Sequence, residues 1–143
     1  MFRFGYRVID KLSIEDKAGF QLFVDDEFNT VEHCELDINE KIIDSHYYNI
    51  SIETKNKIRS ILENNKNVFN LNSKIYSRGQ YNEIEQMFYF ELDNINREIG
   101  CNNIFERNID NNIVKLLIDV FYKISKELSK ENIILNLDNL IKK

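Results

Sequence analysis

The sequence predicts an α+β domain, in which a mostly antiparallel sheet of five or six strands packs on a long C-terminal helix and one shorter helix. Two patterns favour this fold. Apolar residues recur at helical spacing from Asp110 to Leu128, as expected for an amphipathic helix of about five turns. Upstream, residues 87–92 (MFYFEL) have the aromatic, alternating character of a strand, and a sheet containing that strand would cover the apolar stripe of the helix.

The length and composition are those of one domain spanning residues 1–143. Hydrophobic residues make up 43% and charged residues 30% of the chain, which argues against a disordered protein and against a membrane span. Residues 1–9 carry arginines within an apolar run and lack the uninterrupted apolar core of a signal peptide. We therefore expect a cytoplasmic protein that does not bind membranes.

In the N-terminal half, apolar and polar residues alternate with a period of two, which predicts strands. The expected strands are residues 2–9, 20–25, 30–38 and 47–52. In the third of these strands, His33, Glu35 and Asp37 would share the solvent face, with Cys34 on the other side. The start of the fourth strand is ambiguous, because residues 42–43 are also apolar.

In the C-terminal half, Ser51 can cap a helix of about three turns that ends near residues 64–65. A short extended piece over residues 68–71 and a long exposed loop over 72–82 would follow. A hairpin across Asp93-Asn94 would pair the strand at 85–92 with residues 95–101. Asn108 or Asp110 can cap the long helix, and residues 133–141 are apolar enough to pack as a short strand or a helical turn.

The charge of the chain is concentrated in one segment. From Asp25 to Asp44 there are eight acidic residues and one lysine, a net charge of −7, whereas the whole chain carries −5. Such a segment repels nucleic acid and attracts basic proteins, although acidic surfaces also serve solubility alone. The residues that we expect to contact a protein partner are Asp25, Asp26, Glu27, Glu32, Glu35 and Asp37, together with Tyr76 and Tyr81 from the long loop.

The chain shows no catalytic motif. His33, Glu35 and Asp37, with His46, could in principle hold a metal, but we favour an ordinary solvated strand face, because a divalent metal site usually takes ligands from more than one element. The two cysteines lack the paired spacing of metal or redox sites, and no glycine-rich phosphate loop is present. The glutamates around the aromatic strand, Glu83, Glu85 and Glu91, have no specific catalytic spacing. We therefore expect no enzymatic activity, no metal and no cofactor.

The segments IETKNKIRSILENNKNVFNL, MFYFELDNINREI and NNIVKLLIDVFYKISKEL follow one another in this order. As an arrangement of elements over residues 47–128, they resemble small acidic α+β bacterial proteins of unknown function, including immunity proteins that neutralise toxins. The resemblance implies a protein that binds another protein, often a basic toxin nuclease whose active site it covers. Two alternatives stay open, a small-molecule enzyme or binding domain and an oligomerising structural module.

Overall fold

The computed structural model describes residues 1–76, 84–102, 104 and 111–135. Its elements, in chain order, are β1 (Phe2–Asp10), β2 (Gly19–Asp25), β3 (Thr30–Leu36), β4 (Ile42–Asn49), α1 (Ile52–Glu63), the 3₁₀ helix η1 (Lys66–Asn70), β5 (Lys74–Tyr76), β6 (Ile84–Leu92), β7 (Ile95–Asn102) and α2 (Asn111–Ser129). The strands form one sheet in the order β4-β3-β2-β1-β6-β7-β5. Neighbouring strands are antiparallel except β5 and β7, which are parallel.

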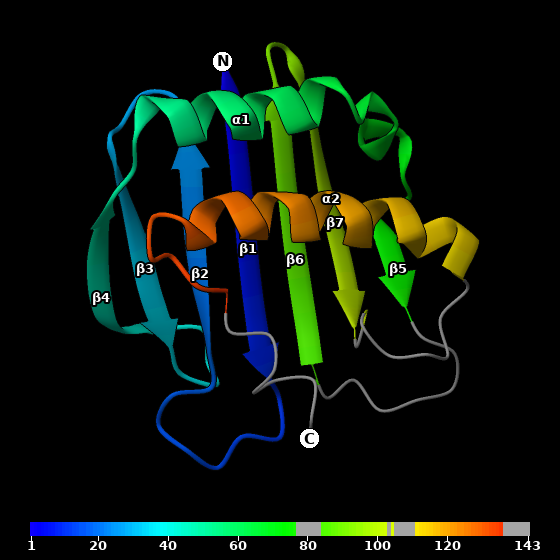
Figure 1. Cartoon of the computed structure of the whole chain (residues 1–143). Coiled ribbons are helices and arrows are strands. Elements are labelled where there is room, and N and C mark those ends of the chain that lie inside the picture. The colour runs from blue at the N-terminus through cyan, green and yellow to red at the C-terminus, as the bar shows by residue number, and fades with distance from the viewer. Residues whose placement is uncertain (77–83, 103, 105–110, 136–143) are drawn as a thin grey trace.

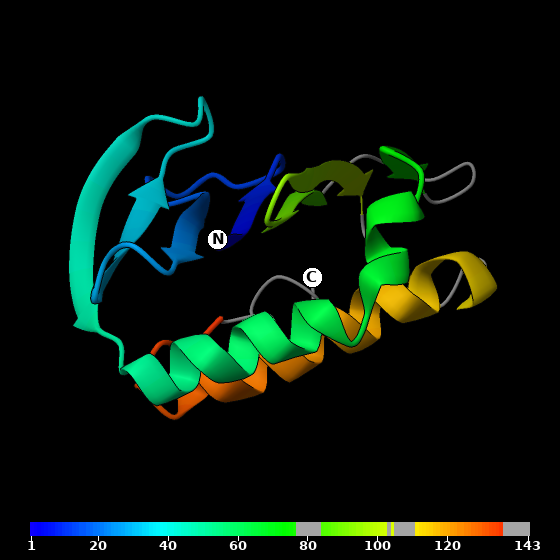
Figure 2. The ribbon, with the colours of Figure 1, turned by 90° about the horizontal axis from the view of Figure 1, so that it is seen from above.

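The two α-helices lie side by side across the same face of the sheet (Figure 1). In the view from above, both helices lie on the same side of the strands, and no described helix covers the opposite face of the sheet (Figure 2). The predicted α+β class, the mostly antiparallel sheet and the two helices are therefore confirmed, but the sheet has seven strands rather than five or six. No helix in the described part of the chain combines the length and apolar character that crossing a membrane requires.

An aromatic cluster joins the middle of the sheet to α2. The Tyr6 ring in β1 lies 4.6 Å from the Phe121 ring and 5.0 Å from the Phe88 ring, measured between centroids. All three residues are buried, and contacts of this kind add to the free energy gained from burial alone. Burial also raises the pKa of Tyr6 well above its usual range, so the phenol stays neutral. Its oxygen accepts a hydrogen bond from Gln86 Nε2 at 3.5 Å.

A second contact fastens the start of α1 to the turn that follows α2. Ser51 caps α1, as predicted, by accepting a hydrogen bond from the Thr54 backbone N–H at 3.2 Å. Glu131 Oε1 accepts hydrogen bonds from the hydroxyls of Ser51 at 2.6 Å and Thr54 at 2.7 Å. These bonds, led by that of Ser51, lower the pKa of Glu131 below its usual 4.5. The ionised carboxylate is thus the form that the folded chain prefers.

This contact makes the free energy of unfolding depend on pH in the acidic range. Because the pKa of Glu131 is lowered on folding, its contribution is complete above pH 4.5 and is lost as the pH falls through the folded-state value. We expect Glu131→Gln to flatten the dependence of the urea midpoint on pH between about pH 5 and 3. The control Glu53→Gln, on the exposed first turn of α1, should keep the wild-type slope. Parallel slopes for Glu131→Gln and wild type would contradict the assignment.

Several predicted elements differ from those observed. Residues 66–70 form a 3₁₀ helix instead of an extended piece, and β5 lies inside the region predicted to be a loop. The fourth strand runs from Ile42 to Asn49 and contains a register shift opposite Glu35 and Leu36. The predicted caps of the long helix, Asn108 and Asp110, lie outside the described residues, as do residues 136–141.

The two faces of β3 are the reverse of those predicted. His33 pairs with Leu22 and therefore points toward the helices, whereas Cys34 pairs with Gln21 on the other face. Cys34 is buried there, and farther along β3 a small separate core contains Leu36 and Ile9. The alternating pattern shows which residues share a face, but it does not show which face the helices cover.

Candidate functional site

The described helices leave the face of the sheet opposite α1 and α2 uncovered (Figure 2), and we call it the uncovered face. Directly paired residues of neighbouring strands share one face, so the strand register defines its members. At its centre are Arg3, Gly5, Arg7, Gln21, Phe23, Met87, Tyr89, Glu91, Glu98 and Gly100. Toward one edge, Glu32 and Tyr47 continue this surface.

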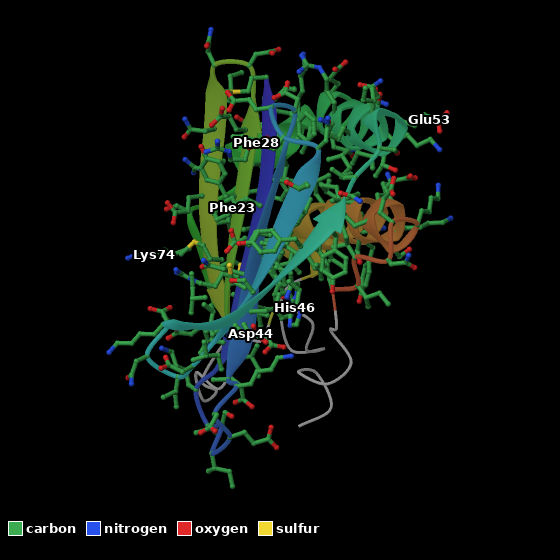
Figure 3. The ribbon with its side chains drawn as sticks, turned by 90° about the vertical axis from the view of Figure 1, so that its left-hand side faces the viewer. Phe23, Phe28, Asp44, His46, Glu53 and Lys74 are labelled. Carbon is green, nitrogen blue, oxygen red and sulfur yellow. The ribbon has the colours of Figure 1, made fainter. Side chains whose placement is uncertain are left out.

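An aromatic pair crosses β1 at the centre of the uncovered face. Gly5 pairs with Phe23 on one side and Tyr89 on the other. Because Gly5 has no side chain, the Phe23 ring lies directly on its backbone, and a Cβ on Gly5 would come 2.6 Å from Phe23 Cδ1. The two rings meet edge to face with centroids 6.4 Å apart. Phe23 is nevertheless 51% exposed, and Figure 3 shows it on the side away from the helices.

Two arginines flank this aromatic pair. Arg3 lies 3.6 Å from a carboxylate oxygen of Asp25, and Arg7 Nε lies 3.6 Å from Glu40 in the β3–β4 turn. Together with Phe23, both arginines line a depression of about 380 Å³. Arg3 Nε is buried without a hydrogen-bond partner among the described residues. The uncovered face thus combines aromatic rings and guanidinium groups, the side chains that protein interfaces use most heavily.

The remaining charge on the uncovered face is negative. By register, five carboxylates lie on it against two arginines and one lysine, an excess of two negative charges. These groups are Asp25, Glu32, Glu85, Glu91 and Glu98, and Arg3, Arg7 and Lys74. The arginines already have acidic neighbours, so the exposed carboxylates of Glu32 and Glu98 dominate what a partner meets.

The predicted acidic residues do not form a single surface. Asp25 and Asp37 hold turns: Asp25 accepts from the backbone N–H groups of Glu27 and Phe28, and Asp37 accepts from those of Asn39 and Lys41. These carboxylates shape the chain as Asx turns do.

The other predicted acids are spread over the molecule. Glu32 lies on the uncovered face, whereas Glu35 points toward the helix side and lies 3.1 Å from Lys17. Asp26 lies 3.9 Å from Arg59 of α1, and Glu27 is exposed in the β2–β3 turn. Only part of the acidic segment therefore belongs to the uncovered face.

The aromatic residues at the centre of the uncovered face are not the two that the sequence suggested, although the register places Tyr76 on the same face, opposite Asn102. Tyr76 is the last residue of β5, and Tyr81 lies outside the described residues. Sequence reasoning missed Phe23, Met87 and Tyr89 as surface residues. A signal was present, because apolar and aromatic residues occupy both phases of the alternation in β2 and β6, which is typical of a strand that makes contacts on both faces.

A cluster of potential metal ligands lies at the edge formed by β3 and β4. Glu35, Asp44 and His46 have side-chain donor atoms within 4.8 Å of one another. Asp44 here takes the place that the sequence suggested for Asp37. His33 lies directly opposite His46, and burial, followed by the charge of Lys17, lowers the pKa of His33 below its usual value.

One described cysteine contacts a carboxylate: Cys34 Sγ donates a hydrogen bond to Glu32 Oε1 at 3.1 Å, and burial, followed by this bond, raises the pKa of Cys34. Burial raises the pKa of Cys101 to about 12, so its thiol stays protonated and unreactive. Glu85 forms an ion pair with Lys11 at 3.4 Å, and Glu91 accepts a hydrogen bond from Tyr89 at 2.6 Å. Glu83, the third glutamate near the aromatic strand, lies outside the described residues.

Comparisons with known proteins add no assignment. No model of a known protein family matches the chain, and no curated protein matches it.

Proposed function

We propose that this chain is a non-catalytic protein that binds a basic protein partner through the uncovered face. The observation that carries the proposal is the Phe23–Tyr89 pair, half-exposed on a sheet face that no described helix covers. In a chain that acts alone, a ring as exposed as that of Phe23 gains little from its position. At an interface, a central aromatic residue surrounded by polar groups contributes most of the affinity.

The charge of the surface favours a basic partner. Carboxylates exceed cations on the uncovered face, and the turns from the acidic segment border it, as the contact between Glu40 and Arg7 shows. Complementary charge speeds encounter and discriminates against acidic partners. Of the partners that this chemistry allows, we propose a toxin nuclease, neutralised by a stoichiometric complex in which the sheet covers its active site, as immunity proteins do.

The test begins with affinity capture from the native host and continues with the purified partner. We expect Phe23→Ala to weaken binding by tenfold or more, since central aromatic residues contribute about 2 kcal/mol or more. We expect Glu32→Gln with Glu98→Gln to slow association and to flatten its dependence on salt, because both carboxylates are exposed. Asp25 and Asp37 are left unchanged, since removing their carboxylates would disturb turns.

Matched controls lie on the helix side. Ile52 is 67% exposed at the start of α1, so Ile52→Ala removes a comparable apolar contact from the opposite layer. Glu53→Gln removes one charge at a position that Figure 3 shows beyond the helices. If the partner binds the Phe23→Ala variant as tightly as wild type while Ile52→Ala weakens binding, the helix layer and not the uncovered face is the interface. A captured nuclease should lose activity in a one-to-one complex.

A further inference from the structure

The edge of the sheet formed by β3 and β4 carries a group of metal-ligating side chains on its helix-facing side. His46 Nε2 lies 3.5 Å from Asp44 Oδ2 and 3.8 Å from Glu35 Oε1. Glu35 and Asp44 are paired across the two strands, and His33 and His46 are the next pair but one along the same ladder. Two adjacent strands, with a register fixed by backbone pairing, therefore hold two imidazoles and two carboxylates on one face.

The spacing of the donor atoms fits one small transition-metal ion. Zinc binds histidine nitrogen and carboxylate oxygen at about 2.0–2.2 Å, and tetrahedral geometry then places neighbouring donors about 3.3–3.5 Å apart. The two distances from His46 already lie at or slightly above that range. Asp44 and His46 are 60% and 49% exposed, so small rotations of mobile side chains would complete the approach.

His33 supplies a second and independent observation. Its Nδ1 is buried and has no hydrogen-bond partner in the part of the chain that the structure describes. The ring stacks on Phe20, with centroids 4.8 Å apart, and His33 is paired with His46 across the two strands. A buried polar atom without a partner is unfavourable. A zinc ion bound by His33 Nδ1 would give this atom a partner.

We propose that Glu35, Asp44 and His46, whose donor atoms lie within 4.8 Å of one another, bind one zinc ion, and that the neighbouring His33 imidazole turns toward the ion as the fourth ligand. The mixed imidazole and carboxylate donors favour zinc over magnesium or calcium, which prefer oxygen alone. The Lys17 ammonium, 3.1 Å from Glu35, must move aside, and its 51% exposure leaves it room to do so. The site lies on the helix side of the sheet, so this proposal is independent of the proposed binding surface.

The test is calorimetric titration of the untagged full chain with zinc chloride at pH 7.5, with cobalt(II) as a spectroscopic probe. We expect saturable binding of one ion per chain and visible cobalt bands of four-coordinate geometry. His46→Asn and Glu35→Gln should each weaken zinc binding by at least about tenfold, because even changes around metal ligands reduce affinity by that amount. Binding should also weaken at pH 5.5, because protons compete with zinc for the ligating side chains.

Glu53→Gln is the matched control, since it removes one carboxylate far from the cluster, and it should bind zinc as wild type does. Asp44→Asn covers the case in which the other variants misfold. The Asp44 side chain is more exposed than those of Glu35 and His46, so this variant should keep the wild-type melting temperature without metal. It should nevertheless bind zinc more weakly than wild type. Wild-type affinity in the His46→Asn and Asp44→Asn variants, or no one-to-one zinc uptake by the wild type, would overturn the proposal.

Discussion

Replacing Phe90 with alanine is expected to lower the free energy of unfolding by about 3–5 kcal/mol, the usual cost of a large aromatic cavity in a core. Phe90 is fully buried in β6. Its ring lies 5.8 Å from that of Phe4 and 6.4 Å from that of Phe88, and the cluster continues to Phe121 of α2. Truncation would therefore open a void where the sheet meets the helix, and packed neighbours would fill it only partly.

Urea unfolding followed by circular dichroism measures this loss. Phe28→Ala is the matched control, because Phe28 is 62% exposed and its truncation should cost less than about 1 kcal/mol. A loss below about 1 kcal/mol for Phe90→Ala would mean that the strand presents its other face to the helices. An equal loss in both variants would show that the aromatic cluster is not the main core.

The burial of Phe90 could be predicted from the sequence because two independent patterns of apolar residues require it. Residues 87–92 alternate with a period of two, and α2 repeats its apolar residues at helical spacing, so each supplies the apolar face that the other requires. The hairpin between β6 and β7 could also be predicted from the sequence. Asp93 takes a positive φ of 54°, a conformation that aspartate and asparagine adopt readily in such turns.

Elements at the edges of the sheet were harder to predict from the sequence. β5 has only three residues, too few to show a period. β4 contains the register shift opposite Glu35 and Leu36, so its alternation is interrupted and its start was placed too late. In β3, residues on both faces are buried, because a small core around Leu36 lies opposite the main one.

The candidate sites depend on relations that a single sequence does not contain. The net charge of segment 25–44 is visible in the chain, but the roles of its acids are not: Asp37 holds a turn, whereas Glu32 and Glu35 lie on opposite faces of the sheet. Likewise, the approach of Asp44 and His46 to Glu35 requires the pairing of β3 with β4. Composition thus suggests a hypothesis about the kind of partner, but it does not show which residues would meet that partner.

Replacing Gly19 with alanine is expected to destabilise the fold by about 3 kcal/mol, at the upper end of the usual cost of overpacking. Gly19 opens β2 and lies between Ile9 of β1 and Leu36 of β3 in the register. A Cβ at this position would overlap the backbone oxygen of Val8 and lie 2.9 Å from its carbonyl carbon. Backbone atoms in a paired strand cannot rotate away as a side chain can, so the β1–β2 ladder itself must shift.

Gly5→Ala provides the matched comparison, because it adds the same methyl group to the neighbouring strand. There the three atoms nearest to the added Cβ all belong to the Phe23 ring, which is half-exposed and can swing outward, so we expect a loss well below that of Gly19→Ala. Urea midpoints of both variants, measured beside wild type, test the difference. Equal losses would mean that Phe23 is held in place as rigidly as the backbone of Val8. In that case the ring would be a structural clamp on β1, and its exposure would no longer argue for a partner.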